Sequence, residues 1–134
     1  MTACGAVPEP LNPKVAAPDG ADHAALVVVA QWYARLPHGE LLDVHDMPTV
    51  RWFEPDERGY LDYGSASDNH VAMGAYWSDE IHLIVRPTIH QSALSYEVLH
   101  WALDATTGDS DHDHTGPAWD QVREVRGALA EAGP

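Results

Sequence analysis

The spacing of apolar residues predicts a helix at the start of the folded region. Between residues 22 and 36, apolar side chains recur at intervals of three and four, the period of a helix with one buried face. Asp22 is a candidate N-cap, and Pro37-His38-Gly39 ends the pattern. We expect this helix to lie against a sheet. The side chains expected on its buried face are Leu26, Val29, Ala30, Tyr33 and Leu36.

Three later segments have the β-branched and aromatic residues typical of strands. Residues 49–54 form a short candidate strand, and residues 59–69 form a polar loop with a short pairing expected at residues 60–63. Residues 71–77 and 80–86 are joined by Ser78-Asp79, which predicts an antiparallel hairpin. Alternation along the second hairpin strand places one set of side chains on each face of the sheet. The two sets are Ile81, Leu83 and Val85, and His82, Ile84 and Arg86.

Capping signals predict two more helices in the last third of the chain. Thr88 and Gln91 have the spacing of a capping box, so we expect a helix that begins there and runs to about residue 105. Gly108 is placed to end it in the left-handed conformation, and Pro117-Ala118-Trp119 begins a final helix. The order of elements predicts one α+β domain over residues 21–134.

Composition narrows the classes of partner. The chain has 134 residues, of which 45% are hydrophobic, enough for one packed core. Seven Lys and Arg stand against 21 Asp and Glu, giving a formal net charge of -14, with nine histidines. This balance argues against nucleic acid or an anionic membrane surface as a partner, and it suits a metal cation. No apolar run approaches the roughly 18 residues of a spanning helix.

The first twenty residues differ in character from the rest. Thr2-Ala3-Cys4-Gly5 resembles the end of a bacterial lipoprotein signal, where the cysteine receives a lipid; Met1 occupies the usual Leu position and no apolar leader precedes it. The resemblance implies a lipid anchor at Cys4 and an extracytoplasmic location. Residues 1–20, rich in proline, would form a tether to the domain. The alternative is a frayed N-terminus with an incidental cysteine.

The candidate chemistry begins on the helix expected from residue 88. Residues 96–100 read Tyr-Glu-Val-Leu-His, and positions four apart lie on one helix face, so Tyr96 and His100 would lie one above the other. Glu97 is displaced by one residue and can reach a ligand held by that face. This is the layout of the HExxH zinc-peptidase helix with tyrosine in place of the first histidine.

A histidine-bearing turn follows that helix. Residues 108–114 read Gly-Asp-Ser-Asp-His-Asp-His, and Trp119 comes soon after. With these features the segment 75–119 resembles the small zincin-type metallopeptidase domains of bacterial lipoproteins. There an edge strand precedes the HExxH helix, and a Gly-Asp-x-Asp-x-x-His turn and a Trp-led helix follow.

The resemblance implies a zincin-like α+β fold, in which a small sheet with an edge-strand hairpin packs on an N-terminal helix and an active-site helix. It further implies a divalent metal, zinc foremost, bound by His100 and His114, with Glu97 as the general base. The strand 80–86 would bind an extended peptide or protein substrate along its edge. We expect the domain to be a monomer.

Tyr96 stands where the family has its first zinc-ligating histidine. A divalent cation can stabilise a phenolate, so Tyr96 is a candidate anionic ligand. A phenolate adds negative charge where imidazole is neutral, which weakens the metal as a Lewis acid and lowers peptidase activity. An oxygen ligand could also favour iron, copper or manganese.

Several alternatives stay open at this point. Tyr96 could be a packed aromatic in a domain without metal, and the domain could be an inactive module that binds metal or peptide. His112 competes with His114 as the downstream ligand. We prefer His114, because it fills the histidine position of the resembled turn and because Asp111 and Asp113 could then orient its imidazole.

Overall fold

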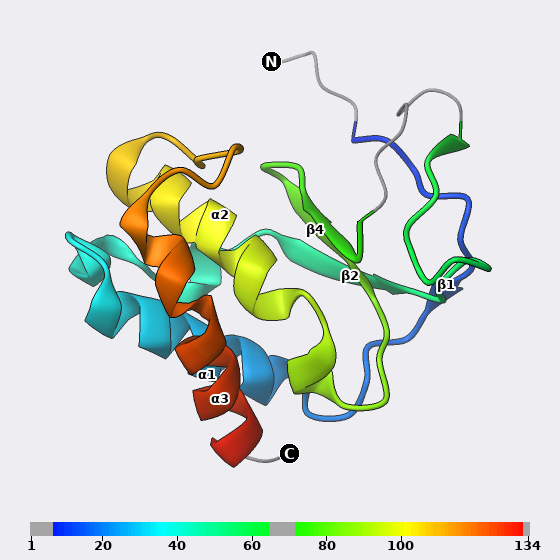
Figure 1. Cartoon of the computed structure of the whole chain (residues 1–134), viewed down its shortest axis with the longest axis horizontal. Helices are drawn as coiled ribbons and strands as arrows, with labels where there is room; N and C mark the ends of the chain where they lie inside the picture. The colour runs from blue at the N-terminus through cyan, green and yellow to red at the C-terminus, as the bar shows by residue number, and fades with distance from the viewer. Residues whose placement is uncertain (1–6, 65–71, 133–134) are drawn as a thin grey trace.

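The computed structural model describes residues 7–64 and 72–132 and has an α+β fold (Figure 1). A small mixed sheet of four strands carries the helices on one face. The strands are β1 (Lys14–Val15), β2 (Thr49–Phe53), β3 (Gly74–Tyr76) and β4 (Glu80–Ile84), and the α-helices are α1 (Ala21–Arg35), α2 (Leu94–Thr107) and α3 (Val122–Ala132). Within the described ranges, no helix is long and apolar enough to cross a membrane.

The sheet has the strand order β1-β2-β4-β3. The predicted hairpin is confirmed, since β3 pairs antiparallel with β4, while β2 pairs parallel with β4. The prediction that residues 80–86 form the edge strand is wrong. Both sides of β4 are occupied by neighbouring strands, so its backbone cannot pair with a peptide. The edge next to α2 is β3.

The alternation predicted for the second hairpin strand is confirmed over β4. Ile81 and Leu83 pack with the helices in the main core, whereas Ile84 joins Phe53 and Leu61 on the opposite face. A short pairing is present at residues 60–63, as predicted, in the form of an antiparallel bridge from Leu61 to Ala72.

The helix α1 buries a different stripe from the expected one. Leu26 and Tyr33 are 52% and 51% exposed, although both were expected in the core. The buried stripe contains Trp32, whose indole nitrogen donates to the Ser95 carbonyl oxygen of α2. Apolar residues occur around most of this helix, so their period alone could not select the face. The buried side chains are Ala24, Val28, Val29 and Trp32, with Leu36 just beyond the helix.

The helix α2 begins later than expected. The capping box at Thr88 and Gln91 is present, but it opens only the short 3-10 turn η4 (Ile89–Gln91). The hydroxyl of Ser92 donates to the Ile89 carbonyl oxygen and accepts from the Leu94 backbone N–H, which separates the turn from the helix. Gly108 ends α2 with φ 81°, as predicted. The final helix is also confirmed; its start is the 3-10 turn η5 (Pro117–Gln121).

Part of the expected tether packs on the sheet. The strand β1 pairs antiparallel with β2. The side chain of Asn12 donates to the carbonyl oxygens of Glu54 and Tyr60 and accepts from the Asp62 backbone N–H. Cys4 lies outside the described residues, so its lipid and the location that it implies stay predictions.

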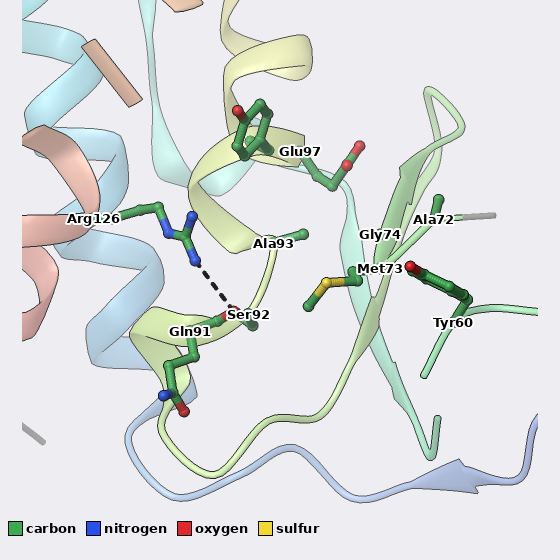
Figure 2. A pocket seen from close by; sticks show the side chains of 10 residues that line it. Tyr60, Ala72, Met73, Gly74, Gln91, Ser92, Ala93, Glu97 and Arg126 are labelled. Carbon is green, nitrogen blue, oxygen red and sulfur yellow. Dashed lines mark hydrogen bonds between the residues drawn. The ribbon is translucent and has the colours of Figure 1, made fainter. Parts of the chain in front are cut away.

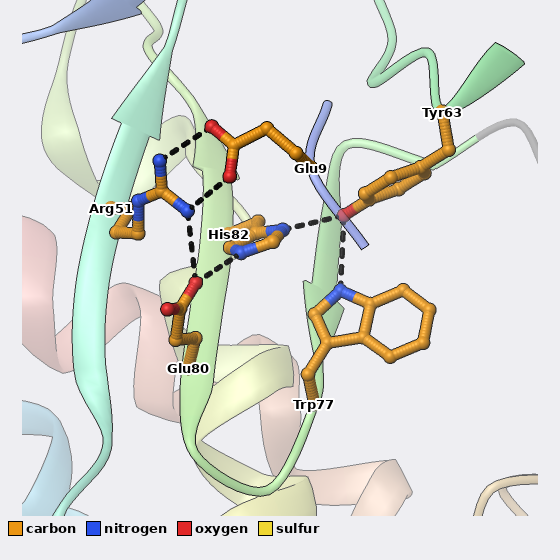
Figure 3. A network of polar contacts seen from close by, with 6 residues as sticks. All are labelled: Glu9, Arg51, Tyr63, Trp77, Glu80 and His82. Atoms are coloured by element: carbon orange, nitrogen blue, oxygen red, sulfur yellow. Dashed lines mark hydrogen bonds and ion pairs between the residues drawn. The ribbon is translucent and has the colours of Figure 1, made fainter. Parts of the chain in front are cut away.

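A polar network covers the sheet face opposite the helices (Figure 3). Arg51 of β2 forms ion pairs with Glu9 and Glu80. The fully buried imidazole of His82 lies between Glu80, at 2.8 Å from Nε2, and the Tyr63 hydroxyl, at 2.7 Å from Nδ1. The network therefore connects the N-terminal segment, both central strands and the loop before β3.

Candidate metal centre

The imidazole of His100 is fixed by the turn after α2. Its Nδ1 lies 2.8 Å from the Ser110 carbonyl oxygen, and a carbonyl can only accept, so Nδ1 carries the proton. The unprotonated Nε2 then points its lone pair to the opposite side. Burial lowers the pKa of His100 and favours the neutral ring. Backbone carbonyls orient metal-binding histidines in this way.

His114 faces this lone pair. The two Nε2 atoms are 3.1 Å apart. Two imidazole nitrogens on one tetrahedral zinc ion, each about 2.0–2.1 Å from it, would be about 3.3–3.4 Å apart. The observed distance is slightly shorter, so a small adjustment would let the two rings share a metal ion. The same distance also allows a hydrogen bond between two neutral rings.

The turn that carries His114 is held by Asp111. Its carboxylate accepts from the backbone N–H groups of Thr115 and Gly116 and from the indole nitrogen of Trp119. These donors hold the pKa of Asp111 far below its usual range. Asp111 and His114 both have positive φ, 57° and 58°, a region that costs a non-glycine residue free energy. Asp111 thus positions His114 through the turn and not through the imidazole.

Aromatic rings surround the histidine pair. The Trp119 ring centroid lies 4.7 Å from that of His100 and 4.1 Å from that of His114. Tyr76 of β3 also stacks on His100, with ring centroids 6.1 Å apart, and donates its hydroxyl hydrogen to Asp104 at 2.8 Å. The rings leave the imidazoles few alternative orientations.

Glu97 lines the same cavity as the two histidines, a space of about 430 Å³. The residue is buried, and burial raises the pKa of its carboxyl group to about 8. A carboxyl group with a pKa near neutrality can both accept and release a proton at physiological pH. Its Cγ packs beside Gly74 of the edge strand β3.

The structure does not bring the Tyr96 ring to the same place as the histidine nitrogens. Tyr96 stacks on Trp119 with centroids 5.7 Å apart, and its centroid is 6.1 Å from that of His114. It lines a neighbouring cavity, which Glu97 also lines. His112 is exposed and lines the larger cavity with His100 and His114.

No group of three or more His, Cys, Asp or Glu side chains arranged to hold a metal ion occurs in residues 7–64 and 72–132. The histidine pair supplies two donors. A metal ion there would need Tyr96, His112, substrate or solvent to complete its coordination.

In residues 7–64 and 72–132, no strand pairs with the outer edge of β3, which lies next to this cavity. The Ile84 N–H donates to Met73, and the Trp77 N–H donates to Glu80. Because backbone groups of an antiparallel strand alternate in direction, those of Gly74 and Tyr76 point away from β4. They lie beside Glu97 and His100, since Gly74, Tyr76 and both of these residues line the cavity.

Two contributors to the site were not predicted from the sequence. One is Tyr76, whose position two residues after Gly74 on a predicted strand places both on one face. The other is the carbonyl of Ser110, which no side-chain pattern reveals. Comparison of the chain with family models, curated proteins and solved structures found no match in any of the three.

Proposed function

We propose that the chain is a metal-dependent hydrolase of zincin-like fold, with His100 and His114 as metal ligands and Glu97 as general base. The observation that carries the proposal is the 3.1 Å approach of the two Nε2 atoms in the cavity that Glu97 lines. The strained backbone of His114 supports it, because such conformations gather at functional sites.

A divalent metal, zinc foremost, would supply a Lewis acid that polarises a carbonyl group. Glu97 would accept a proton from an attacking water molecule and pass it to the leaving amine. The burial that raises the pKa of Glu97 would limit access of bulk solvent to its carboxyl group. The proposed substrate is a peptide paired with the outer edge of β3 at Gly74 and Tyr76.

The first experiment measures metal stoichiometry. The protein is stripped with a chelator, given one equivalent of zinc and analysed for bound metal. We expect one zinc ion per chain in the native protein, and a loss in His100→Ala and in His114→Ala. His23→Ala is the matched control, because His23 is exposed on α1. Full stoichiometric binding in His100→Ala would refute the site.

The third protein donor is tested separately. If Tyr96 ligates, Tyr96→Phe lowers the affinity for zinc, whereas His112→Ala does not; the reverse result assigns the role to His112. We further expect Tyr96→His to increase hydrolysis of a peptide, because a neutral imidazole leaves the metal a stronger Lewis acid than a phenolate does.

A further inference from the structure

A second cavity, which Glu97 also lines, adjoins the cavity of the histidine pair; Figure 2 shows its lining residues. It has a volume of about 320 Å³ and extends between Arg126 of α3 and Met73, just before β3. Gly74 and Glu97 line this cavity and also the cavity of the histidine pair. A peptide at Gly74 could therefore extend from the histidines on one side into the second cavity on the other.

Among the residues that the structure describes, Arg126 is the only Lys or Arg side chain that lines either cavity. The cations Arg35, Arg51 and Arg58 form ion pairs with carboxylates. In the described part of the chain Arg126 forms none. Its Nε and Nη2 donate to the carbonyl oxygens of His90 and Gln91 at 3.3 and 3.4 Å. Carbonyl groups are neutral, so in the described part of the chain no carboxylate forms an ion pair with this guanidinium, although Glu97 also lines the cavity.

The surroundings of Arg126 suit an anion such as a carboxylate, which has two acceptor oxygens in one plane. The carbonyl bonds hold the guanidinium at the turn before α2, which reduces the entropy lost when a ligand binds. The Gln91 side-chain oxygen accepts from the Thr88 N–H, so its amide group keeps two hydrogens to donate. Tyr60 lies on the opposite side of the cavity (Figure 2).

We propose that the second cavity binds a carboxylate of the substrate peptide through Arg126. The carboxylate is the C-terminal group or an acidic side chain, and a guanidinium can bind either with two parallel hydrogen bonds. The inference rests on the proposed function, since it names the substrate class of that site. A net charge of -14 repels anions at long range, so recognition of an acidic peptide requires a local cation of this kind.

The test measures peptide binding to chelated, metal-free protein by NMR titration, which separates it from the metal experiment. The probes are four tetrapeptides: Ala-Ala-Ala-Ala with a free or an amidated C-terminus, and amidated Ala-Ala-Glu-Ala and Ala-Ala-Gln-Ala. We expect at least one carboxylate peptide to bind about tenfold or more tightly than its neutral partner, with a shift of the Arg126 Nε–H resonance. The pair that shows the difference identifies the source of the carboxylate.

The control variants separate charge recognition from folding. Arg126→Gln is expected to abolish the preference for carboxylate, and Arg126→Lys to retain part of it. Arg123→Gln on the exposed side of α3 makes the same change in charge and should keep the full preference. Equal binding of acid and neutral peptides to the native protein, no binding of any probe at millimolar concentration, or a preference that survives Arg126→Gln would each overturn the proposal. Loss of zinc binding alone would refute only the metal site.

Discussion

Single residues in the centre are positioned by different means. His100 is held by helix α2 and by the Ser110 carbonyl, whereas His114 depends on a turn in which Asp111 accepts several hydrogen bonds. The sequence indicated His100 and Glu97 through their spacing, and it left His112 and His114 as alternatives. The left-handed backbone at His114 turns its imidazole toward His100, and a pattern of residue types does not contain that information.

Glu97→Gln tests the role of the carboxyl group at constant size. The amide cannot accept a proton, so we expect kcat for peptide hydrolysis to fall by about 10²–10⁴-fold. Metal stoichiometry should stay unchanged, because Glu97 is not a proposed ligand. Hydrolysis assays on zinc-loaded protein, with elemental analysis of the same sample, check both points. Undiminished turnover in this variant would exclude Glu97 as the base.

Asp111→Asn tests the turn. One oxygen of Asp111 accepts from the Gly116 N–H and the Trp119 indole N–H, at 2.7 and 2.8 Å, while the other accepts from Thr115. An amide NH2 in either position faces a donor, so the turn loosens. We expect zinc affinity to fall by about tenfold or more.

Asp113→Asn provides the control for Asp111→Asn, because it removes the same charge from the same exposed turn. Zinc affinities of the two variants are compared by competition with a chromogenic chelator. If both variants lose affinity equally, the loss comes from the charge near the site and not from the Asp111 hydrogen bonds.

At the scale of elements, the approach of β3 to α2 defines the cavity wall. A Cβ atom added at Gly74 would lie 2.8 Å from Cβ of Ala93 and 2.9 Å from Cγ of Glu97. Only a residue without a side chain permits this distance between strand and helix. The sequence predicted both elements, but it did not predict their contact, which depends on the position of β3 at the sheet edge.

Gly74→Ala should therefore destabilise the fold. We expect the free energy of unfolding to fall by about 1–3 kcal/mol, as for overpacking in a core. Gly127→Ala on α3 is the matched control: nothing lies within 4 Å of its added Cβ, and the same change should stabilise the helix by about 0.5–1 kcal/mol. Urea unfolding of both variants gives the two values. A stable Gly74→Ala protein would contradict the close packing of β3 on α2.

At the scale of the whole molecule, local signals predicted the elements and long-range pairing decided their arrangement. The hairpin of β3 and β4 follows from a two-residue turn. The parallel pairing of β2 with β4 joins strands separated by residues 54–79, and no local signal encodes it. That pairing makes β4 an interior strand and leaves β3 as the edge. The sequence predicted the elements of the site, but it did not predict which strand lies at the edge of the sheet and can pair with a peptide.

The polar network across β2 and β4, with His82 buried at its centre, makes stability depend on pH. Burial lowers the pKa of His82, and the hydrogen bond from His82 lowers that of Glu80. In the unfolded chain His82 takes up a proton below its ordinary pKa of about 6.5, whereas the folded protein resists protonation. The unfolded state then binds more protons, so the contribution of His82 to stability is present above that pH and is lost as pH falls. Glu80 adds a second loss of stability at lower pH. Its pKa in the folded protein is lowered, so this loss begins when the pH falls below the ordinary pKa of a carboxyl group.

His82→Gln isolates the first of these losses. The variant keeps a polar side chain between Glu80 and Tyr63 but cannot titrate. We expect it to be less stable than the native protein at pH 7.5, with the difference shrinking as pH falls from 6.5 toward 5. Urea unfolding of chelated samples across this range measures the difference, and His23→Gln controls for loss of an exposed imidazole. A difference independent of pH would show that His82 is not protected from protonation, because linkage requires the slope to follow the proton count of each state.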